Sequence, residues 1–162
     1  MRGSVEVHRY LVERAIPHEF YRLDRPLRRI DEASEVLGLD PGIVVAAELF
    51  DAKDNFVLAL TSASSCASSA AIARTFGSKR VRPVSKERVT AHTGFFADWL
   101  PPVGHERASR TVMDAELSTA DVLYAAGGDP GVMLVLRATD LLRATAAEVA
   151  ELTAEEVQAA SS

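Results

Sequence analysis

The residues best suited to hold a ligand lie in one segment, from Thr93 to Gly104. Glycines stand near both ends, a proline pair stiffens it, and three aromatic side chains lie between them: Phe95, Phe96 and Trp99. Such a segment is too rigid and too aromatic for a simple connector, and loops of this kind hold ligands against a scaffold. We therefore expect this loop to border a binding site.

A second candidate for chemistry is a basic stretch in an otherwise acidic protein. Residues 74–112 contain eight Lys and Arg against three Asp and Glu, whereas the whole chain of 162 residues has a net charge of −5. Clustered cations beside aromatic residues suit nucleic acid, because cations neutralise phosphates and rings stack on bases. The alternative interpretation is a solvated, charged surface.

Other kinds of catalytic site lack their characteristic spacing. The serines between Ser62 and Ser69 have no Gly-x-Ser-x-Gly elbow, and helix capping explains them better. Residues 127–131 lack the spacing and the lysine of a phosphate-binding loop and favour a hairpin turn. The four histidines and the one cysteine, Cys66, show no metal-ligand spacing, so we expect neither a metal nor another cofactor.

The composition is typical of a globular cytoplasmic protein. Hydrophobic residues make up 48% of the chain and charged residues 25%, and the length suits one domain. No apolar run reaches the roughly 20 residues of a membrane span, and one cysteine suits a reducing compartment. We expect a single domain over residues 1–162, with residues 1–4 disordered or a cloning remnant and residues 153–162 forming a C-terminal helix or tail.

The elements that must position these residues alternate between helices and short strands. Apolar residues at helical spacing predict a first helix over residues 5–16, and Gly38 and Gly77 end two later ones. Capping-box patterns that begin at Thr145 and Thr153 predict two more helix starts. Strands are predicted over residues 20–23, 43–50, 56–61, 80–84, 111–114, 122–125 and 132–136. This pattern predicts an α+β domain whose seven or so strands form a mixed sheet or a partly closed barrel.

The ordered set of motifs resembles the YbaK family, the prolyl-tRNA-synthetase-associated editing domains that hydrolyse mischarged aminoacyl-tRNA. The resemblance covers nearly the whole chain and implies the fold of that family. The matching landmarks are Tyr21 after the first helix, Leu37-Gly38-Leu39-Asp40, the strand Ile43–Phe50, Phe76-Gly77-Ser78-Lys79-Arg80, Thr93-Gly94-Phe95, Pro102-Val103-Gly104, Met113-Asp114, Ala126-Gly127-Gly128 and Thr139-Asp140-Leu141.

The resemblance also implies a substrate site. In that family the glycine-to-proline loop holds the aminoacyl ester and the terminal adenosine, and its backbone amides bind the ester carbonyl. The residues carried over are Gly94, Phe95, Pro102 and Gly104, with Gly127 and Gly128 on the pocket floor and Tyr21 facing the site. From the basic stretch, Lys79, Arg80 and Arg82 are expected to bind tRNA.

The chain departs from the family pattern at the presumed centre of the site. Ala46 stands where the family usually has a lysine that holds the tRNA end or the ester. Glu48 should share a strand face with Ala46, so a carboxylate replaces a cation in the substrate site. Glu48 is the candidate catalytic residue, which binds the α-amino group of the ester or orients the attacking water as a general base. Asp98 and Trp99 replace small residues before the prolines and would crowd the pocket or redirect the loop.

These observations predict a free-standing editing protein that hydrolyses the ester of a mischarged tRNA. Its partner would be the aminoacylated 3′ end of tRNA and not a membrane, and the sequence leaves monomer and homodimer equally open. The alternative is a catalytically degenerate protein of the same fold that binds tRNA or a small molecule without hydrolysis.

Overall fold

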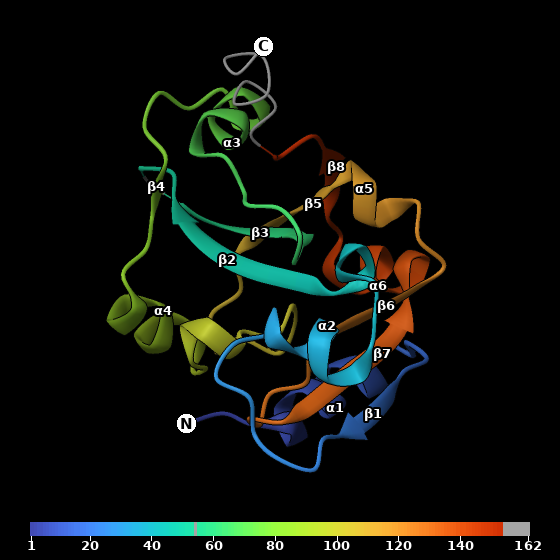
Figure 1. Cartoon of the computed structure of the whole chain (residues 1–162). Coiled ribbons are helices and arrows are strands. Elements are labelled where there is room, and N and C mark those ends of the chain that lie inside the picture. Colours follow the sequence, from blue (N-terminus) through green and yellow to red (C-terminus); the bar gives the residue numbers. More distant parts are fainter. Residues whose placement is uncertain (54, 154–162) are drawn as a thin grey trace.

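The computed structural model describes residues 1–53 and 55–153, which form two β-sheets flanked by helices (Figure 1). The strands are β1 (Glu19–Arg22), β2 (Val45–Asp51), β3 (Phe56–Ser62), β4 (Arg82–Pro83), β5 (Arg110–Asp114), β6 (Val122–Ala126), β7 (Val132–Arg137) and β8 (Glu148–Ala150). The larger sheet has the order β4-β2-β3-β5-β8 and the smaller one β1-β7-β6. The fold is therefore α+β, as predicted, and the sheets do not close into a barrel within the described residues.

The helices that surround these sheets are short. They are α1 (Ser4–Glu13), α2 (Glu32–Leu37), α3 (Ser69–Phe76), α4 (Lys86–Thr93), α5 (Ala115–Ser118) and α6 (Ala138–Thr145), with 3-10 helices η1 (Pro41–Ile43) and η2 (Ala97–Trp99). Gly38 and Gly77 end α2 and α3 in the left-handed conformation, as their positions predict. None of the helices described is long and apolar enough to cross a membrane.

Strands β2 and β3 form an antiparallel hairpin at the centre of the larger sheet. Ala46 lies opposite Thr61, and Glu48 lies opposite Ala59. On the other side of β3, strand β5 runs parallel to it, and β8 runs parallel to β5. Strand β4 pairs only with the last two residues of β2. The outer edge of β2 is consequently left uncovered by β4 along its first five residues.

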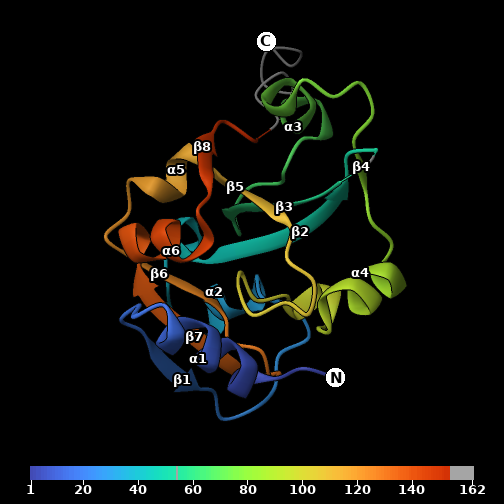
Figure 2. The same cartoon turned by 180° about the vertical axis from the view of Figure 1, so that it is seen from behind.

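The apolar core consists of three clusters arranged in layers with the sheets (Figures 1 and 2). The central cluster joins α1 to the facing sides of both sheets through Val7, Leu11, Leu58, Leu60, Leu134 and Leu136. A second cluster joins α2 to the opposite side of the smaller sheet through Ala33, Ala126 and Met133. A third cluster joins α3 to the opposite side of the larger sheet through Ile72, Val57 and Ala59. Because successive side chains point to opposite faces of a strand, one strand contributes residues to two clusters.

Strand β2 contacts all three clusters. Leu49 packs into the central cluster from one face of the strand. On the other face, Val44, just before the strand, belongs to the cluster under α2, and Phe50 belongs to the cluster under α3. Ala46 and Glu48 lie between them on this same face, where the sheet borders a cavity. The gap between these two clusters therefore leaves Ala46 and Glu48 of this face accessible to a ligand.

The C-terminal region differs from the prediction, because no helix starts at Thr145. Thr145 is the last residue of α6, and its hydroxyl donates to the carbonyl of Leu141 at 2.8 Å. Ala146 then adopts a left-handed conformation with φ of 52°, and Glu148 begins β8, where its carboxylate pairs with Arg110. Strand pairing with β5 overrides the local capping pattern. The predicted C-terminal helix or tail, and the second capping box with it, lies outside the described residues beyond position 153.

Asp114 fastens the end of β5 to two other segments. Its buried carboxylate accepts hydrogen bonds from the backbone N–H of Glu116 at 3.1 Å and of Leu152 at 2.8 Å.

The change Asp114→Ala removes the cap of α5 and leaves a buried N–H without an acceptor. We expect the free energy of unfolding in urea to fall by about 2–4 kcal/mol. The exposed Asp121→Ala should change it by less than about 0.5 kcal/mol, and equal effects of the two changes would contradict this role.

Candidate functional site

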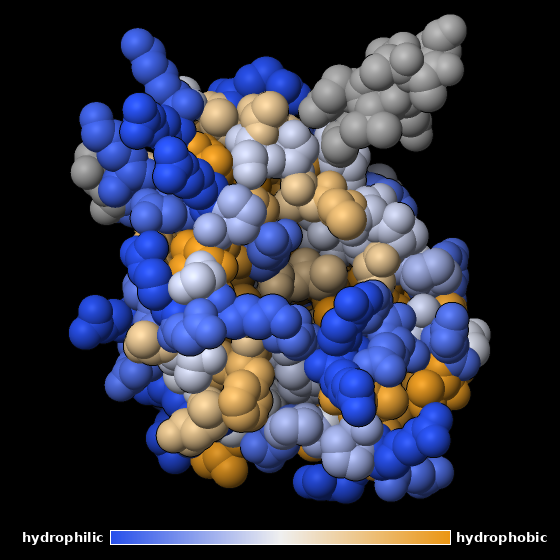
Figure 3. Space-filling model, turned by 60° about the vertical axis from the view of Figure 1, so that its left-hand side comes forward, coloured by the Kyte–Doolittle hydropathy of each residue, from blue (hydrophilic) through white to orange (hydrophobic). Residues whose placement is uncertain are grey.

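A cavity of about 390 Å³ opens beside the face of β2 that carries Ala46 and Glu48. Its walls come from the β2–β3 hairpin, the turn after β3, the start of α2, the segment from β4 into α4, and η2. Its volume lies in the range of small-molecule sites. On the side of the molecule that Figure 3 brings forward, hydrophobic surface lies in recesses between hydrophilic residues. The polar and charged lining residues central to the site are Arg29, Asp31, Glu48, Thr61, Lys86 and Asp98.

Glu48 carries an unpaired carboxylate into this cavity. Within the described residues, the carboxylate makes no hydrogen bond and no ion pair. The side chain reaches solvent because the cavity is open, yet the surrounding walls remove part of its hydration. This desolvation raises the pKa of the Glu48 carboxyl above its usual value, because it disfavours the charged form. Such a group favours a ligand that supplies a positive charge or a proton.

The cavity floor beside Glu48 consists of small residues and one hydroxyl. Ala46 and Ala63 line it, so no cation stands at the position where the family resemblance implies a lysine. Thr61, directly opposite Ala46 on β3, also lines the cavity although only 4% of its surface is exposed. Its hydroxyl has no hydrogen-bond partner among the residues that the structure describes. Glu48 and Thr61 are thus two polar groups on one face, both available to a ligand.

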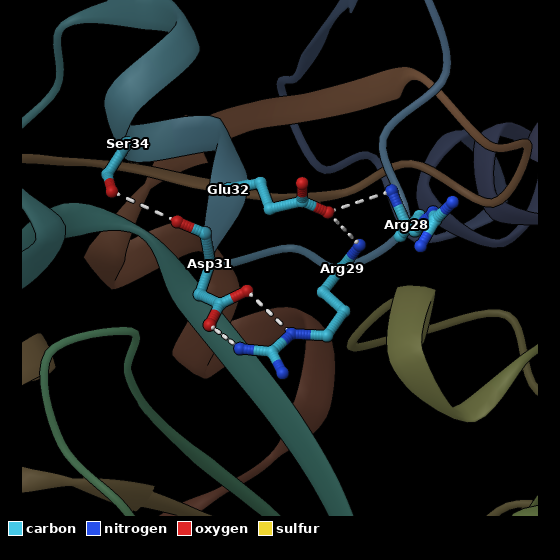
Figure 4. Close-up of polar contacts among 5 residues, drawn as sticks. All are labelled: Arg28, Arg29, Asp31, Glu32 and Ser34. Atoms are coloured by element: carbon cyan, nitrogen blue, oxygen red, sulfur yellow. Dashed lines mark hydrogen bonds and ion pairs between the residues drawn. The ribbon is translucent and has the colours of Figure 1, made fainter.

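Just before α2, Arg29 pairs with Asp31, which is two residues further along the chain (Figure 4). The guanidinium contacts both carboxylate oxygens of Asp31, with Nε donating to Oδ1 at 3.1 Å, and this hydrogen bond lowers the pKa of Asp31. Occupied in this way, the Asp31 carboxylate does not cap α2. The Glu32 carboxylate instead accepts the backbone N–H groups of Arg28 and Arg29 at 2.9 and 2.8 Å, and the Ser34 hydroxyl donates to the Asp31 carbonyl.

A second ion pair connects α4 to η2 at the cavity. Lys86 Nζ lies 2.9 Å from Asp98 Oδ2, and both side chains are substantially exposed. The backbone carbonyl of Asp98 also accepts the N–H of Ile30 at 3.2 Å, which joins η2 to the start of α2. Both cations in the cavity lining, Lys86 and Arg29, are therefore already paired with acids.

The middle of the loop from Thr93 to Gly104 forms part of this cavity. Ala97, Asp98 and Leu100 line it, whereas Trp99 is turned into the cluster under α2 with 2% of its surface exposed. The indole N–H of Trp99 has no hydrogen-bond partner within the described residues. Of the two residues before the prolines that were expected to crowd the pocket or redirect the loop, Trp99 lies in the core and Asp98 lines the cavity.

The ends of the loop are anchored outside the cavity by the N-terminal segment. The backbone N–H of Arg2 donates to the carbonyl of Gly94 at 2.9 Å, and its guanidinium donates to the carbonyl of Gly104 at 3.2 Å. Gly104 has φ of 84°, and a Cβ there would lie 3.1 Å from the Cα of Val7. Phe95 is buried in the central cluster. These loop residues therefore hold the fold together and do not line the cavity.

Pro102 and Gly104 line a separate cavity of about 130 Å³ that also contains His105. The Nε2 of His105 lies 2.7 Å from the carbonyl of Pro101, to which it donates in the neutral tautomer. Burial lowers the pKa of His105 to about 4, so the ring is neutral near pH 7. This small cavity is distinct in its lining from the one that contains Glu48.

The glycine pair at the start of the β6–β7 turn is also buried away from the cavity. Gly127 donates its N–H to the carbonyl of Val132 at 2.7 Å, and Gly128 packs against the backbone of Ser4. Tyr21 lies on β1, is exposed and does not line the cavity that contains Glu48. The structure thus separates these residues from Glu48, which the sequence had grouped with them.

The basic residues lie on the segment that leads into the cavity wall. Lys79, Arg80 and Arg82 are all exposed and do not line the cavity. The chain continues from Arg82 through β4 to Lys86, which does line it. An elongated polyanion could therefore contact the basic segment while its end enters the cavity.

Sequence reasoning did not select Thr61, Arg29 or Lys86 as site residues. The hairpin register contains the signal for Thr61, because the residue opposite Ala46 must share its face. The ion pair of Lys86 with Asp98 spans 12 positions and depends on the path of the loop, so no local pattern indicates it.

Comparisons with known proteins relate the chain to one family. Residues 24–144 match the family model described as Aminoacyl-tRNA editing domain. A solved structure described as a candidate trans-editing enzyme for prolyl tRNA synthetase is 27% identical, with a TM-score of 0.85, over 93% of this chain and 96% of that chain. A chain from work on epitope backbone grafting by computational design is 28% identical, with a TM-score of 0.83, over the same shares of both chains. A hypothetical protein at 21% identity, covering 92% of this chain and 99% of its own, has a TM-score of 0.86 and shares the fold.

Removing the acid that holds Lys86 should make the cavity more attractive to anions. We expect Asp98→Asn to increase the affinity for inorganic pyrophosphate by about three- to tenfold at low salt, because it frees a cation and removes a repelling charge. Titration calorimetry measures this affinity. The control is Asp51→Asn, whose carboxylate pairs with Arg88 at 3.6 Å outside the cavity lining. The role of Asp98 would be refuted by an equal gain in the control or by no gain in Asp98→Asn.

Proposed function

The chain belongs to the family of aminoacyl-tRNA editing domains, and from this premise we propose that it hydrolyses the ester of a mischarged aminoacyl-tRNA as a free-standing protein. The observation that carries the proposal is the unpaired carboxylate of Glu48 in a cavity of small-molecule size. Glu48 lies inside the part of the chain that matches the family. Similarity along 93% of the chain to a candidate trans-editing enzyme supports action on tRNA that another enzyme has charged.

The proposed reaction needs only water and one group that can accept a proton or bind an amine. Water adds to the ester carbonyl carbon, the bond from that carbon to the ribose oxygen breaks, and a water proton passes to this oxygen. The products are a free amino acid and an uncharged tRNA. Glu48 either accepts the water proton or binds the α-amino group, and its raised pKa makes it a better proton acceptor than an ordinary glutamate.

The rest of the substrate would lie along the basic segment. Lys79, Arg80 and Arg82 are exposed and precede the cavity wall in the chain, so their charges can neutralise phosphates near the tRNA 3′ end. The proposed location is the cytoplasm, where charged tRNAs are used, and the one thiol of Cys66 is compatible with reducing conditions.

A panel of mischarged tRNAs tests the proposal with the Glu48→Gln variant beside the parent protein. We expect the parent to hydrolyse at least one ester and Glu48→Gln to lose at least about 100-fold in turnover, a typical loss for a general base. The affinity for uncharged tRNA should be unchanged or slightly improved, because a negative charge near the acceptor end is removed. Deacylation rates and filter binding measure the two quantities, and a fully active Glu48→Gln would remove Glu48 from the mechanism.

Arg80→Ala tests the path of the tRNA in the same assay. We expect weaker tRNA binding with a shallower salt dependence, because one phosphate contact is lost. Arg9→Ala, on the exposed surface of α1, is the matched control and should bind as the parent does.

A second candidate function is supported by the alanine at position 46. The cavity floor there offers no cation to hold a tRNA end or an ester, so the protein could bind its ligand without hydrolysing it. Salt-sensitive tRNA binding with no deacylation of any ester in the panel would favour this second function over the first.

A further inference from the structure

The charges that line the cavity do not balance. Its lining contains the cations Arg29 and Lys86 and the carboxylates Asp31, Glu48 and Asp98, a net charge of −1. Each cation is paired with one acid, Arg29 with Asp31 and Lys86 with Asp98. The uncompensated charge is therefore that of Glu48. Since nearby walls remove part of its hydration, a cationic group of a ligand is the natural complement of this cavity.

A second unsatisfied group lies on the same face of the sheet. Thr61 borders the cavity with 4% of its surface exposed, and its hydroxyl has no hydrogen-bond partner among the described residues. The hydroxyl borders the cavity, so a ligand atom that bonds to it adds an interaction that the described residues do not supply. Thr61 is opposite Ala46, and Glu48 is two residues further along β2, which makes Thr61 and Glu48 diagonal neighbours.

We propose that Glu48 and Thr61 together form a receptor for the primary ammonium group of the substrate. The cavity would then accept esters of amino acids with a free α-amino group and reject esters whose amine is acylated. This inference rests on the proposed function for the identity of the ester, and it selects amine binding as the role of Glu48.

The spacing of the two residues suits a group of this size. Diagonal positions on paired strands lie about 7–8 Å apart at Cα, and a glutamate side chain covers part of that distance. An ammonium group has three N–H donors, so one can bond to the Glu48 carboxylate and another to the Thr61 hydroxyl oxygen. Ala46, between them, leaves room for the group because it has only a methyl side chain. An N-acyl amide has no charge and only one N–H donor, so it cannot bond to both groups at once and supplies no positive charge to Glu48.

The same contact would assist hydrolysis as well as selection. A carboxylate beside an amine favours its protonated form. A protonated α-amino group withdraws electrons from the adjacent ester, which makes the carbonyl carbon more reactive toward water. Glu48 would therefore keep the α-amino group of the bound substrate protonated, which is the form in which the ester is more reactive.

The test uses two stable probes, 3′-deoxy-3′-(L-alanylamino)adenosine and its N-acetyl derivative, whose amide bond replaces the ester. Binding is followed by titration calorimetry and by protection of Cys66 from alkylation, since Cys66 is exposed, lines the cavity and is the one cysteine of the chain. We expect the amine probe to bind about 10- to 100-fold more tightly than the N-acetyl probe, as for a hydrogen bond to a charged group.

Three variants assign this preference to the two residues. Glu48→Gln should abolish the difference between the probes, whereas Glu19→Gln, an exposed strand glutamate of the smaller sheet, should retain it. Thr61→Val should weaken binding of the amine probe, and Thr61→Ser should restore it because the hydroxyl returns. The affinity of the parent for the amine probe should also fall as acid protonates Glu48.

The outcomes separate this inference from the proposed function. Equal affinity for the two probes, no binding of either, or a preference that persists in Glu48→Gln would overturn the ammonium receptor even if esters are hydrolysed. Deacylation of N-acetyl-aminoacyl-tRNA at the parent rate for free aminoacyl-tRNA would overturn it as well. Preferential binding of the amine probe without deacylation of any tRNA would refute the proposed hydrolysis and leave the receptor standing.

Discussion

The arrangement of the cavity depends on the packing of one strand, β2, against three apolar clusters. One of its faces packs against the central cluster, and its other face runs from the cluster under α2 to the cluster under α3. A strand face can be solvated only where neither neighbouring cluster covers it, and on this face of β2 Ala46 and Glu48 line the cavity, together with Ala47 and Leu49 of the other face. The cavity is therefore a consequence of how the layers meet, and its chemistry is determined by the side chains at positions 46 and 48 and by Thr61 opposite them.

The loop from Thr93 to Gly104 has a role that its composition only partly indicates. Its glycines and aromatic residues suggested a ligand-binding segment, but Phe95 and Trp99 are core residues, and Gly94 and Gly104 are tied to Arg2. A segment anchored at both ends holds its middle in one place, and that middle supplies Asp98 to the cavity. Its rigidity thus positions a cavity wall while its most conspicuous side chains stabilise the fold.

Most elements, but few site contacts, could be predicted from the sequence. Periodicity and capping residues predicted α1 to α3 and seven strands because these signals are local. β8 was missed because its pairing with β5 is a distant interaction. The position of Thr61 depends on the hairpin register. The predicted strands end at Phe50 and begin at Phe56, which would pair these two residues, whereas in the structure Phe50 pairs with Val57. A slip of one residue reverses the faces, so even a nearly correct hairpin could not assign Thr61 to the cavity.

The uneven distribution of charge suits a ligand that is anionic along its length and cationic at its end. Residues 74–112 have an excess of Lys and Arg, yet Lys79, Arg80 and Arg82 stay outside a cavity whose unpaired charge is the carboxylate of Glu48. Phosphates and an ammonium group would then be recognised on separate surfaces. The proposed hydrolysis would change this balance, because the released amino acid would carry a new carboxylate. At about 5 Å from Glu48 and an effective dielectric constant near 20, the two carboxylates repel by roughly 3 kcal/mol. In the proposed reaction, the charge that attracts the substrate would therefore also favour release of the product.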